Sequence, residues 1–132
     1  MSRSSSIEGL SVPGPGAMGP YSDITRIGEL LFLSGRIGIA RGGAALVTGG
    51  IAAQTKQALA NIAEVLALVG GCLDDVVKAN VYLTDMADFA VMNEIYGGAF
   101  GERKPSRTTV GVAALPMGAL VEIEAIAAAK RP

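Results

Sequence analysis

The sequence of 132 residues contains no histidine, no tryptophan and a single cysteine, Cys72. One cysteine cannot form an internal disulfide, and without histidine it cannot complete a structural zinc site, which needs four nitrogen or sulfur ligands. The absence of histidine also excludes catalytic arrangements such as Ser-His-Asp and Cys-His. Proton transfer near neutral pH must therefore use a carboxylate, a tyrosine, a lysine, the cysteine or water.

Long apolar runs are absent as well. No stretch without Asp, Glu, Lys or Arg exceeds 14 residues, whereas a membrane-spanning helix needs about 20 apolar residues. The first ten residues, MSRSSSIEGL, lack the apolar centre of a signal peptide. We therefore expect a soluble, cytoplasmic protein, and its length suits one domain.

Charged residues make up only 17% of the sequence, compared with about 25% in typical domains, while 50% of the residues are hydrophobic. With so few charged residues, a small domain cannot present a polar surface on all sides. We therefore expect one face to be buried against copies of the same chain. The net charge of −1 argues against a nucleic-acid partner, which usually needs a clustered basic surface. A small basic cluster of Arg103, Lys104 and Arg107 suits a single small anion better than RNA.

The N-terminal segment differs in composition from the rest of the chain. Residues 1–16 are rich in serine, proline and glycine and predict a flexible tail, followed by a single domain over residues 17–132. The run from Gly14 to Gly19 matches the G-x-G-x-x-G pattern of dinucleotide-binding proteins. That fingerprint needs a strand before it and a helix after it, and neither is expected here, so we interpret the run as a linker.

Hydrophobic periodicity predicts the order βββαβαββ. Gly70 and Gly71 are expected to end the first helix as a left-handed cap, and Thr84 and Asp85 are suitable N-caps for the second helix. This order predicts an α+β fold with both helices on one face of a mixed sheet and the other face meeting another subunit. The predicted strands cover residues 22–27, 30–39, 46–48, 75–83, 107–113 and 121–129, and the first helix covers residues 51–69.

Arg107 is the first candidate for chemistry, because it opens a predicted strand directly after the loop GERKPS. The planar guanidinium of arginine suits bidentate binding of a carboxylate, although a solvated arginine at a strand end is the alternative. Thr109 lies two residues further and therefore on the same face of the strand. Its hydroxyl could hold a ligand or a water, or it could be an ordinary strand threonine.

The last strand and the second helix supply three further polar candidates. Glu122 and Glu124 share one face of the last strand, and Glu122 could transfer protons if it is partly buried, because desolvation raises the pKa of a carboxyl. We interpret Glu124 as facing solvent. Asn93 interrupts an apolar stripe that includes Phe89, Tyr96 and Phe100, and it either caps a neighbouring loop or reaches toward a site.

Four segments, taken together in their order and spacing, resemble the RidA (YjgF) family over residues 18–129. They are Gly19-Pro20-Tyr21-Ser22, Leu33-Ser34-Gly35-Arg36-Ile37, Asn80-Val81-Tyr82-Leu83-Thr84-Asp85-Met86 with Phe89 and Asn93, and Pro105-Ser106-Arg107 followed by Leu115-Pro116 and Val121-Glu122-Ile123-Glu124-Ala125.

The resemblance implies a chorismate-mutase-like fold and a homotrimer with ligand clefts between neighbouring subunits. It also implies hydrolysis of enamine or imine intermediates, of the 2-aminoacrylate type, to 2-oxo acids and ammonia without a metal or cofactor. In such a family Arg107 would match the arginine that binds the substrate carboxylate, and Glu122 the glutamate that activates water. The residues expected to line the cleft are Tyr21, Ser34, Gly35, Asn93 and Thr109.

The chain also departs from the family pattern at three places. Thr109 stands where well-known members carry cysteine, Arg36 stands where they commonly carry glutamine, and Gly97-Gly98 replaces bulky residues near the end of the second helix. These differences suggest a divergent subgroup. They leave open the alternative of a non-catalytic trimeric protein that binds small carboxylates, and an endoribonuclease is a less favoured third reading.

Overall fold

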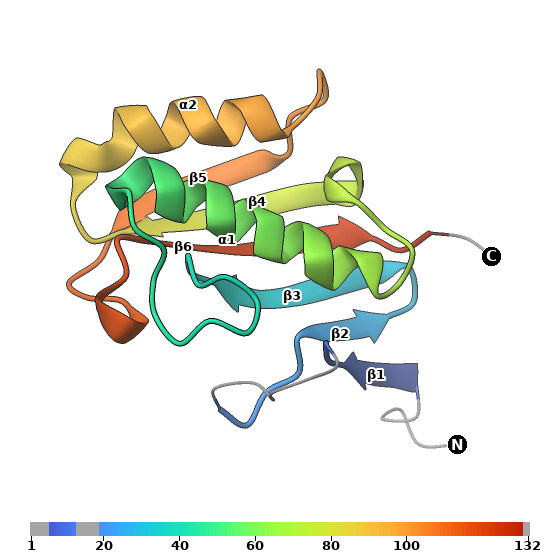
Figure 1. Cartoon of the computed structure of the whole chain (residues 1–132). Coiled ribbons are helices and arrows are strands. Elements are labelled where there is room, and N and C mark those ends of the chain that lie inside the picture. The colour runs from blue at the N-terminus through green and yellow to red at the C-terminus, as the bar shows by residue number, and fades with distance from the viewer. Residues whose placement is uncertain (1–5, 13–18, 131–132) are drawn as a thin grey trace.

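A computed structural model describes residues 6–12 and 19–130 as a six-stranded sheet with two α-helices on one face (Figure 1). The sheet order is β1-β2-β3-β6-β4-β5, and only the β4–β5 pair is parallel. The prediction of an α+β fold with helices on one face of a mixed sheet is confirmed. The elements are β1 (Ile7–Leu10), β2 (Ile24–Ile27), β3 (Leu30–Arg36), α1 (Gly50–Ala67), β4 (Val76–Leu83), α2 (Phe89–Ala99), β5 (Ser106–Gly111) and β6 (Val121–Ala128).

The first three strands are not the three that the sequence predicts. The expected strand at 46–48 reduces to a single bridge between Leu46 and Ile39. In its place, the structure has an additional strand at the start of the chain, β1, which lies inside the predicted tail and pairs with β2. Strand β1 has only four residues and a central glycine, so the sequence shows no clear periodicity there. It is held by backbone hydrogen bonds to the edge of β2 that does not pair with β3. Residues 1–5 and 13–18, which hold the rest of the predicted tail and most of the glycine motif, lie outside the described residues.

Helix α1 forms the main layer of the core against β3 and β6. Its buried side chains recur at helical spacing, and Ile62, Val65 and Leu66 are at most 2% exposed. Each fully buried side chain of this size contributes about 1.5–3 kcal/mol relative to exposure. Gly70 adopts a left-handed conformation with φ of 73°, and the Gly71 N–H donates to the Leu66 carbonyl at 2.9 Å, which confirms the predicted cap.

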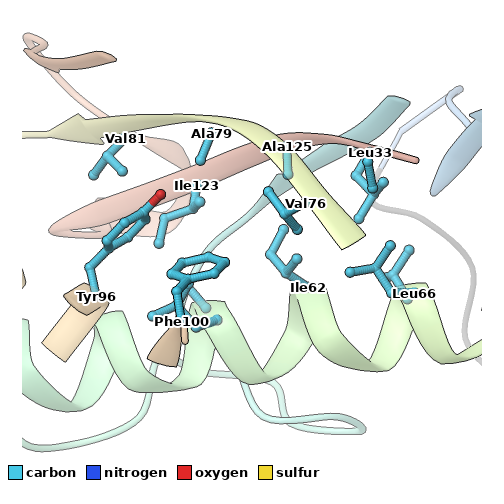
Figure 2. Close-up of a cluster of buried hydrophobic side chains, with 14 of the residues drawn as sticks. Leu33, Ile62, Leu66, Val76, Ala79, Val81, Tyr96, Phe100, Ile123 and Ala125 are labelled. Carbon is cyan, nitrogen blue, oxygen red and sulfur yellow. The ribbon is translucent and has the colours of Figure 1, made fainter. Parts of the chain in front are cut away.

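Helix α2 packs beside α1. Its Tyr96 and Phe100, the residue after the helix, belong to the core, as Figure 2 shows. The Asp85 carboxylate accepts a hydrogen bond from the Ala87 N–H and caps the short 3-10 turn that leads into α2. Phe89, which the sequence places on the apolar stripe of this helix, is 36% exposed. No helix in the described ranges is long and apolar enough to cross a membrane.

The register of the sheet assigns each site candidate to one of its two faces. Val81 pairs with Ile123 on β6 and with Thr109 on β5, and these residues point toward the helices. The next residue, Tyr82, pairs with Glu122 and Val110, so these side chains point to the opposite face. We call the side that α1 and α2 cover the helix face and the other side the open face.

Candidate functional site

Arg107 lies on the edge strand β5 and points toward helix α2. Its Nη2 donates to Oδ1 of Asn93 at 2.6 Å, and its Cζ lies 4.7 Å from the ring centroid of Tyr96 and 5.7 Å from that of Phe89. An amide and two aromatic rings therefore hold the guanidinium in place without neutralising its charge. Among the residues that the structure describes, no carboxylate pairs with Arg107. The arrangement can bind a small anion.

Two hydroxyl groups near Arg107 are buried without a hydrogen-bond partner in the described part of the chain, those of Thr109 and Tyr96. Thr109 shares the helix face with Arg107, as the sequence predicts. Tyr96 is only 4% exposed, and burial raises the pKa of its hydroxyl, with Arg107 acting in the opposite direction. Buried polar atoms usually have a partner, so both hydroxyls are able to accept a ligand or a water. We call Arg107, Asn93, Tyr96, Phe89 and Thr109 the arginine half-site.

The other two members of the basic cluster are engaged by the fold. Arg103 donates to the backbone carbonyl of Asp74, and Lys104 Nζ donates to two backbone carbonyls at the end of α2, at 2.9 Å each. Cations at the C-terminal end of a helix stabilise the carbonyls that lack partners there. Arg103 and Lys104 therefore hold the loop that leads into β5. Among the described hydrogen bonds, Arg107 is the member of the cluster that donates to a side chain and to no backbone carbonyl.

Glu122 lies on the open face of β6, directly beside Gly35 of β3. A Cβ atom placed on Gly35 would lie 2.6 Å from Oε2 and 2.9 Å from Cδ of Glu122, so only glycine allows this position of the carboxylate. Burial, followed by the charge of Glu124, raises the pKa of Glu122 above its usual value. A half-buried carboxylate with a raised pKa is a stronger base than an exposed one, which makes Glu122 a candidate for proton transfer.

Ser34, the residue before Gly35, joins β3 to the segment before β2, which contains Tyr21. The Ser34 hydroxyl donates to the Ser22 carbonyl at 2.7 Å, and Tyr21, the residue before Ser22, is 46% exposed. A bulge in β3 between Leu33 and Arg36 turns this part of the strand. We call Glu122, Gly35, Ser34 and Tyr21 the glutamate half-site.

Arg36 pairs with Asp23. The Arg36 guanidinium forms an ion pair with Oδ1 of Asp23, whose other oxygen accepts the Val12 N–H at 2.6 Å. Asp23 is 4% exposed, so its charge requires these partners. Arg36 therefore joins β3 to the segment before β2, and Asp23 in turn holds Val12, two residues after the end of β1.

The two half-sites lie on opposite faces of the sheet. Arg107 is on β5 and Glu122 on β6, with β4 between them, so the two strands are about 10 Å apart. Arg107 lies against α2 on the helix face, whereas Glu122 projects from the open face. A substrate the size of an amino acid cannot contact both side chains within one chain.

A cavity of about 220 Å³ on the open face has none of the predicted site residues in its lining. Its lining includes Asn80 and Glu124 among apolar neighbours, and the full set is Phe32, Leu33, Lys78, Asn80, Glu124, Ala125 and Ile126. Within residues 6–12 and 19–130, no group of three or more Cys, Asp and Glu side chains is placed to hold a metal ion.

Sequence reasoning missed the aromatic partners of Arg107 and the hydrogen bonds of Glu124. The sequence predicts Phe89 and Tyr96 only as members of an apolar stripe, although their spacing of four and three residues from Asn93 places all three on one side of α2. Glu124 was assigned to solvent, but it accepts hydrogen bonds from Asn80 and Tyr82. The sequence contains one signal for these hydrogen bonds: alternation along β4 places Asn80 and Tyr82 on the same face of the strand.

Comparisons with known proteins identify the family of the chain. A family model described as Endoribonuclease L-PSP matches residues 13–129. Over 113 residues the chain is 49% identical to a RutC family protein of Pyrococcus horikoshii, covering 86% of this chain and 90% of that protein. It is 44% identical to the human 2-iminobutanoate/2-iminopropanoate deaminase, covering 86% and 82%.

A solved structure shows the same fold. The crystal structure of TdcF from E. coli with bound serine superimposes with a TM-score of 0.85 at 32% identity, covering 93% of this chain and 99% of that one. The chain therefore belongs to the Endoribonuclease L-PSP family, the RidA (YjgF) family that its motifs indicate.

Proposed function

We propose that this protein hydrolyses reactive 2-imino acids and their enamine forms to 2-oxo acids and ammonia. The observation that carries the proposal is the environment of Arg107, a guanidinium held by Asn93 and two aromatic rings with no carboxylate partner among the described residues. The carboxylate of a small substrate would complete this arrangement with bidentate hydrogen bonds. The name of the human relative and the serine in the related crystal structure support a substrate of amino-acid size.

We further propose that the site forms between subunits of a homotrimer. Because Arg107 and Glu122 project from opposite faces, the arginine half-site of one chain needs the glutamate half-site of a neighbour. Exposed apolar side chains on the open face support such an assembly: Leu30 is 44% exposed, Phe32 40% and Val110 41%. The edge strand β5, which carries Arg107, would then lie at the subunit boundary.

The proposed reaction uses one water and needs no covalent enzyme intermediate. Arg107 holds the substrate carboxylate and fixes the electrophilic imine carbon next to the glutamate half-site. Glu122 accepts a proton from water as the water oxygen bonds to the carbon of the protonated imine and the C=N electron pair moves to nitrogen, which gives a neutral carbinolamine. Glu122 then returns this proton to the nitrogen. As the C–N bond breaks, its electron pair leaves with ammonia, and the carbinolamine hydroxyl gives its proton to Glu122 and then to solvent, so that the carbonyl forms. The products are the 2-oxo acid and ammonia.

Thr109 is proposed to hydrogen-bond the substrate or the attacking water. Its buried Oγ1 lacks a partner among the described residues and lies on the same face as Arg107. A threonine hydroxyl both donates and accepts hydrogen bonds, so we propose that Thr109 can serve in place of the cysteine thiol of the family pattern. Tyr21, Ser34 and Gly35 are proposed to line the cleft on the side of Glu122.

Gly35→Ala is expected to lower kcat/KM for imine hydrolysis by about ten- to a hundredfold, because the added Cβ displaces the Glu122 carboxylate. Thermal stability should change little, since the atoms in the way belong to the end of a flexible side chain. The matched control is Gly98→Ala. Apart from the neighbouring residues and the nearby backbone of its own helix, no described atom lies within 4 Å of the added Cβ, and helix propensity predicts a gain in folding stability of up to about 1 kcal/mol. Unchanged activity in Gly35→Ala would show that the position of Glu122 is not critical.

The proposed function can be tested by competition with semicarbazide, which traps imines. An amino-acid oxidase generates imines from several L-amino acids, and the protein should reduce semicarbazone formation and accelerate release of the 2-oxo acid. Carboxylate binding without any acceleration would favour the binding-protein alternative. RNA cleavage has less support, because two of the three clustered cations bind backbone carbonyls.

A further inference from the structure

Glu124 is held more firmly than its position on an open sheet face suggests. Its Oε2 accepts two hydrogen bonds, from Asn80 Nδ2 at 2.9 Å and from the Tyr82 hydroxyl at 2.8 Å. Both donors come from β4, where Asn80 is the cross-strand partner of Glu124 and Tyr82 that of Glu122. Two donors on one oxygen fix the orientation of this carboxylate against β4.

Glu122 is the other carboxylate on this face, two residues away. The structure shows no hydrogen bond or ion pair from Glu122 to any described residue. Two neighbouring carboxyls in such different surroundings are expected to differ in function: the one with donors is fixed in place, and the one without donors is free to exchange a proton.

Among the described groups that face Glu122 from its own strand and the adjoining strands, Glu124 is the one whose charge acts on the pKa of Glu122. Strand β3 presents Gly35 and an Arg36 that is paired with Asp23, and strand β4 presents the Tyr82 hydroxyl. The hydrogen bond to Glu124 raises the pKa of Tyr82, so Tyr82 stays protonated. The cation of β4, Lys78, lies opposite Ile126 and is therefore beyond Glu124.

We propose that Glu124 is a positioning residue for the proposed deaminase: Asn80 and Tyr82 fix its carboxylate on the same face of β6 as Glu122, and through its charge it supports the role of Glu122 as the base. This inference rests on the proposed function, in which Glu122 takes a proton from water. Glu124 does not contact the substrate and acts only through Glu122. Burial and the Glu124 charge act in the same direction on the pKa of Glu122, burial being the larger effect.

The hydrogen bonds of Glu124 allow a substitution that removes only its charge. Because both donors converge on Oε2, the amide oxygen of glutamine in Glu124→Gln can accept both of them while the amide nitrogen takes the place of Oε1. Two controls accompany it. Glu102→Gln removes one negative charge from an exposed loop, and Tyr82→Phe removes one donor but keeps the Glu124 charge.

The direct measurement is an NMR titration of the Glu122 carboxyl carbon in the whole protein, which requires no enzymatic activity. Its midpoint should move to lower pH in Glu124→Gln and stay in place in Glu102→Gln. In parallel, the acidic limb of the kcat/KM profile should move to lower pH, and the rate on the plateau should fall about two- to fivefold as the base weakens.

The two measurements separate the inference from the function on which it rests. A Glu122 midpoint that does not move in Glu124→Gln overturns the inference, whatever the activity. A midpoint that moves in a protein without deaminase activity supports the coupling and contradicts the proposed function. If Glu124 has a purely structural role, Glu124→Gln should lower the stability of the protein without moving the NMR midpoint of Glu122 or the acidic limb of the kcat/KM profile.

Discussion

Arg107→Ala is expected to reduce kcat/KM for imine hydrolysis by about a hundredfold or more. The variant loses the bidentate partner of the substrate carboxylate, and with it the positioning of the imine carbon. Arg107→Lys should lose nearly as much, because an ammonium cannot form the planar pair of hydrogen bonds or keep the same contact with Asn93 and the Tyr96 ring. Coupled assays of oxo-acid release with purified variants measure both effects.

Arg103 offers a matched control for this prediction. It belongs to the same basic cluster, but its guanidinium binds the backbone carbonyl of Asp74. Arg103→Lys should therefore keep activity within about twofold, since surface substitutions away from the site have small effects. If Arg107→Lys and Arg103→Lys are equally active, Arg107 does not bind the carboxylate.

Glu122→Gln is expected to lower kcat by about a hundred- to ten-thousandfold, the usual contribution of a general base. In the wild type, activity should fall as the pH drops through the raised pKa of Glu122, because only the ionised carboxylate accepts a proton from water. The residual activity of Glu122→Gln should lack this acidic limb. A residual rate that keeps the same limb would assign the base to another group.

The same substitution is expected to stabilise the protein at neutral pH. A carboxyl whose pKa is raised in the folded state destabilises the fold when it is ionised, fully so above the folded pKa. The thermal advantage of Glu122→Gln over the wild type should therefore be present at pH 7 and shrink as the pH falls from the folded pKa toward about 4.3, the unfolded value. Thermal melts across this range measure the effect, and a destabilised variant at pH 7 would contradict it.

Much of the fold could be predicted because the central elements carry their own patterns. Strand β6 alternates buried and half-buried residues along its length, and α1 repeats its apolar positions at helical spacing. Strand β1 could not be predicted in this way, since it depends on the free edge of β2 and on the Asp23 carboxylate that binds Val12. Local patterns do not show hydrogen bonds between distant segments.

The site could be predicted only in part for a related reason. Alternation shows that Arg107 and Thr109 share a face, and that Glu122 and Glu124 share a face. It does not show whether these two faces are the same, because that depends on the strand order and on the registers of β4 with β5 and β6. The separation of Arg107 from Glu122 is therefore a result of the three-dimensional structure.

The most direct test of a site shared between subunits is to mix two inactive variants, Arg107→Ala and Glu122→Gln, and allow their subunits to exchange. In a random equal mixture, half of the arginine half-sites and half of the glutamate half-sites are intact, so about one quarter of the sites combine both and regain activity. We expect close to a quarter of the wild-type rate, rising with the extent of exchange. A mixture that exchanges subunits fully but stays inactive would show that Arg107 and Glu122 do not act together across a subunit boundary.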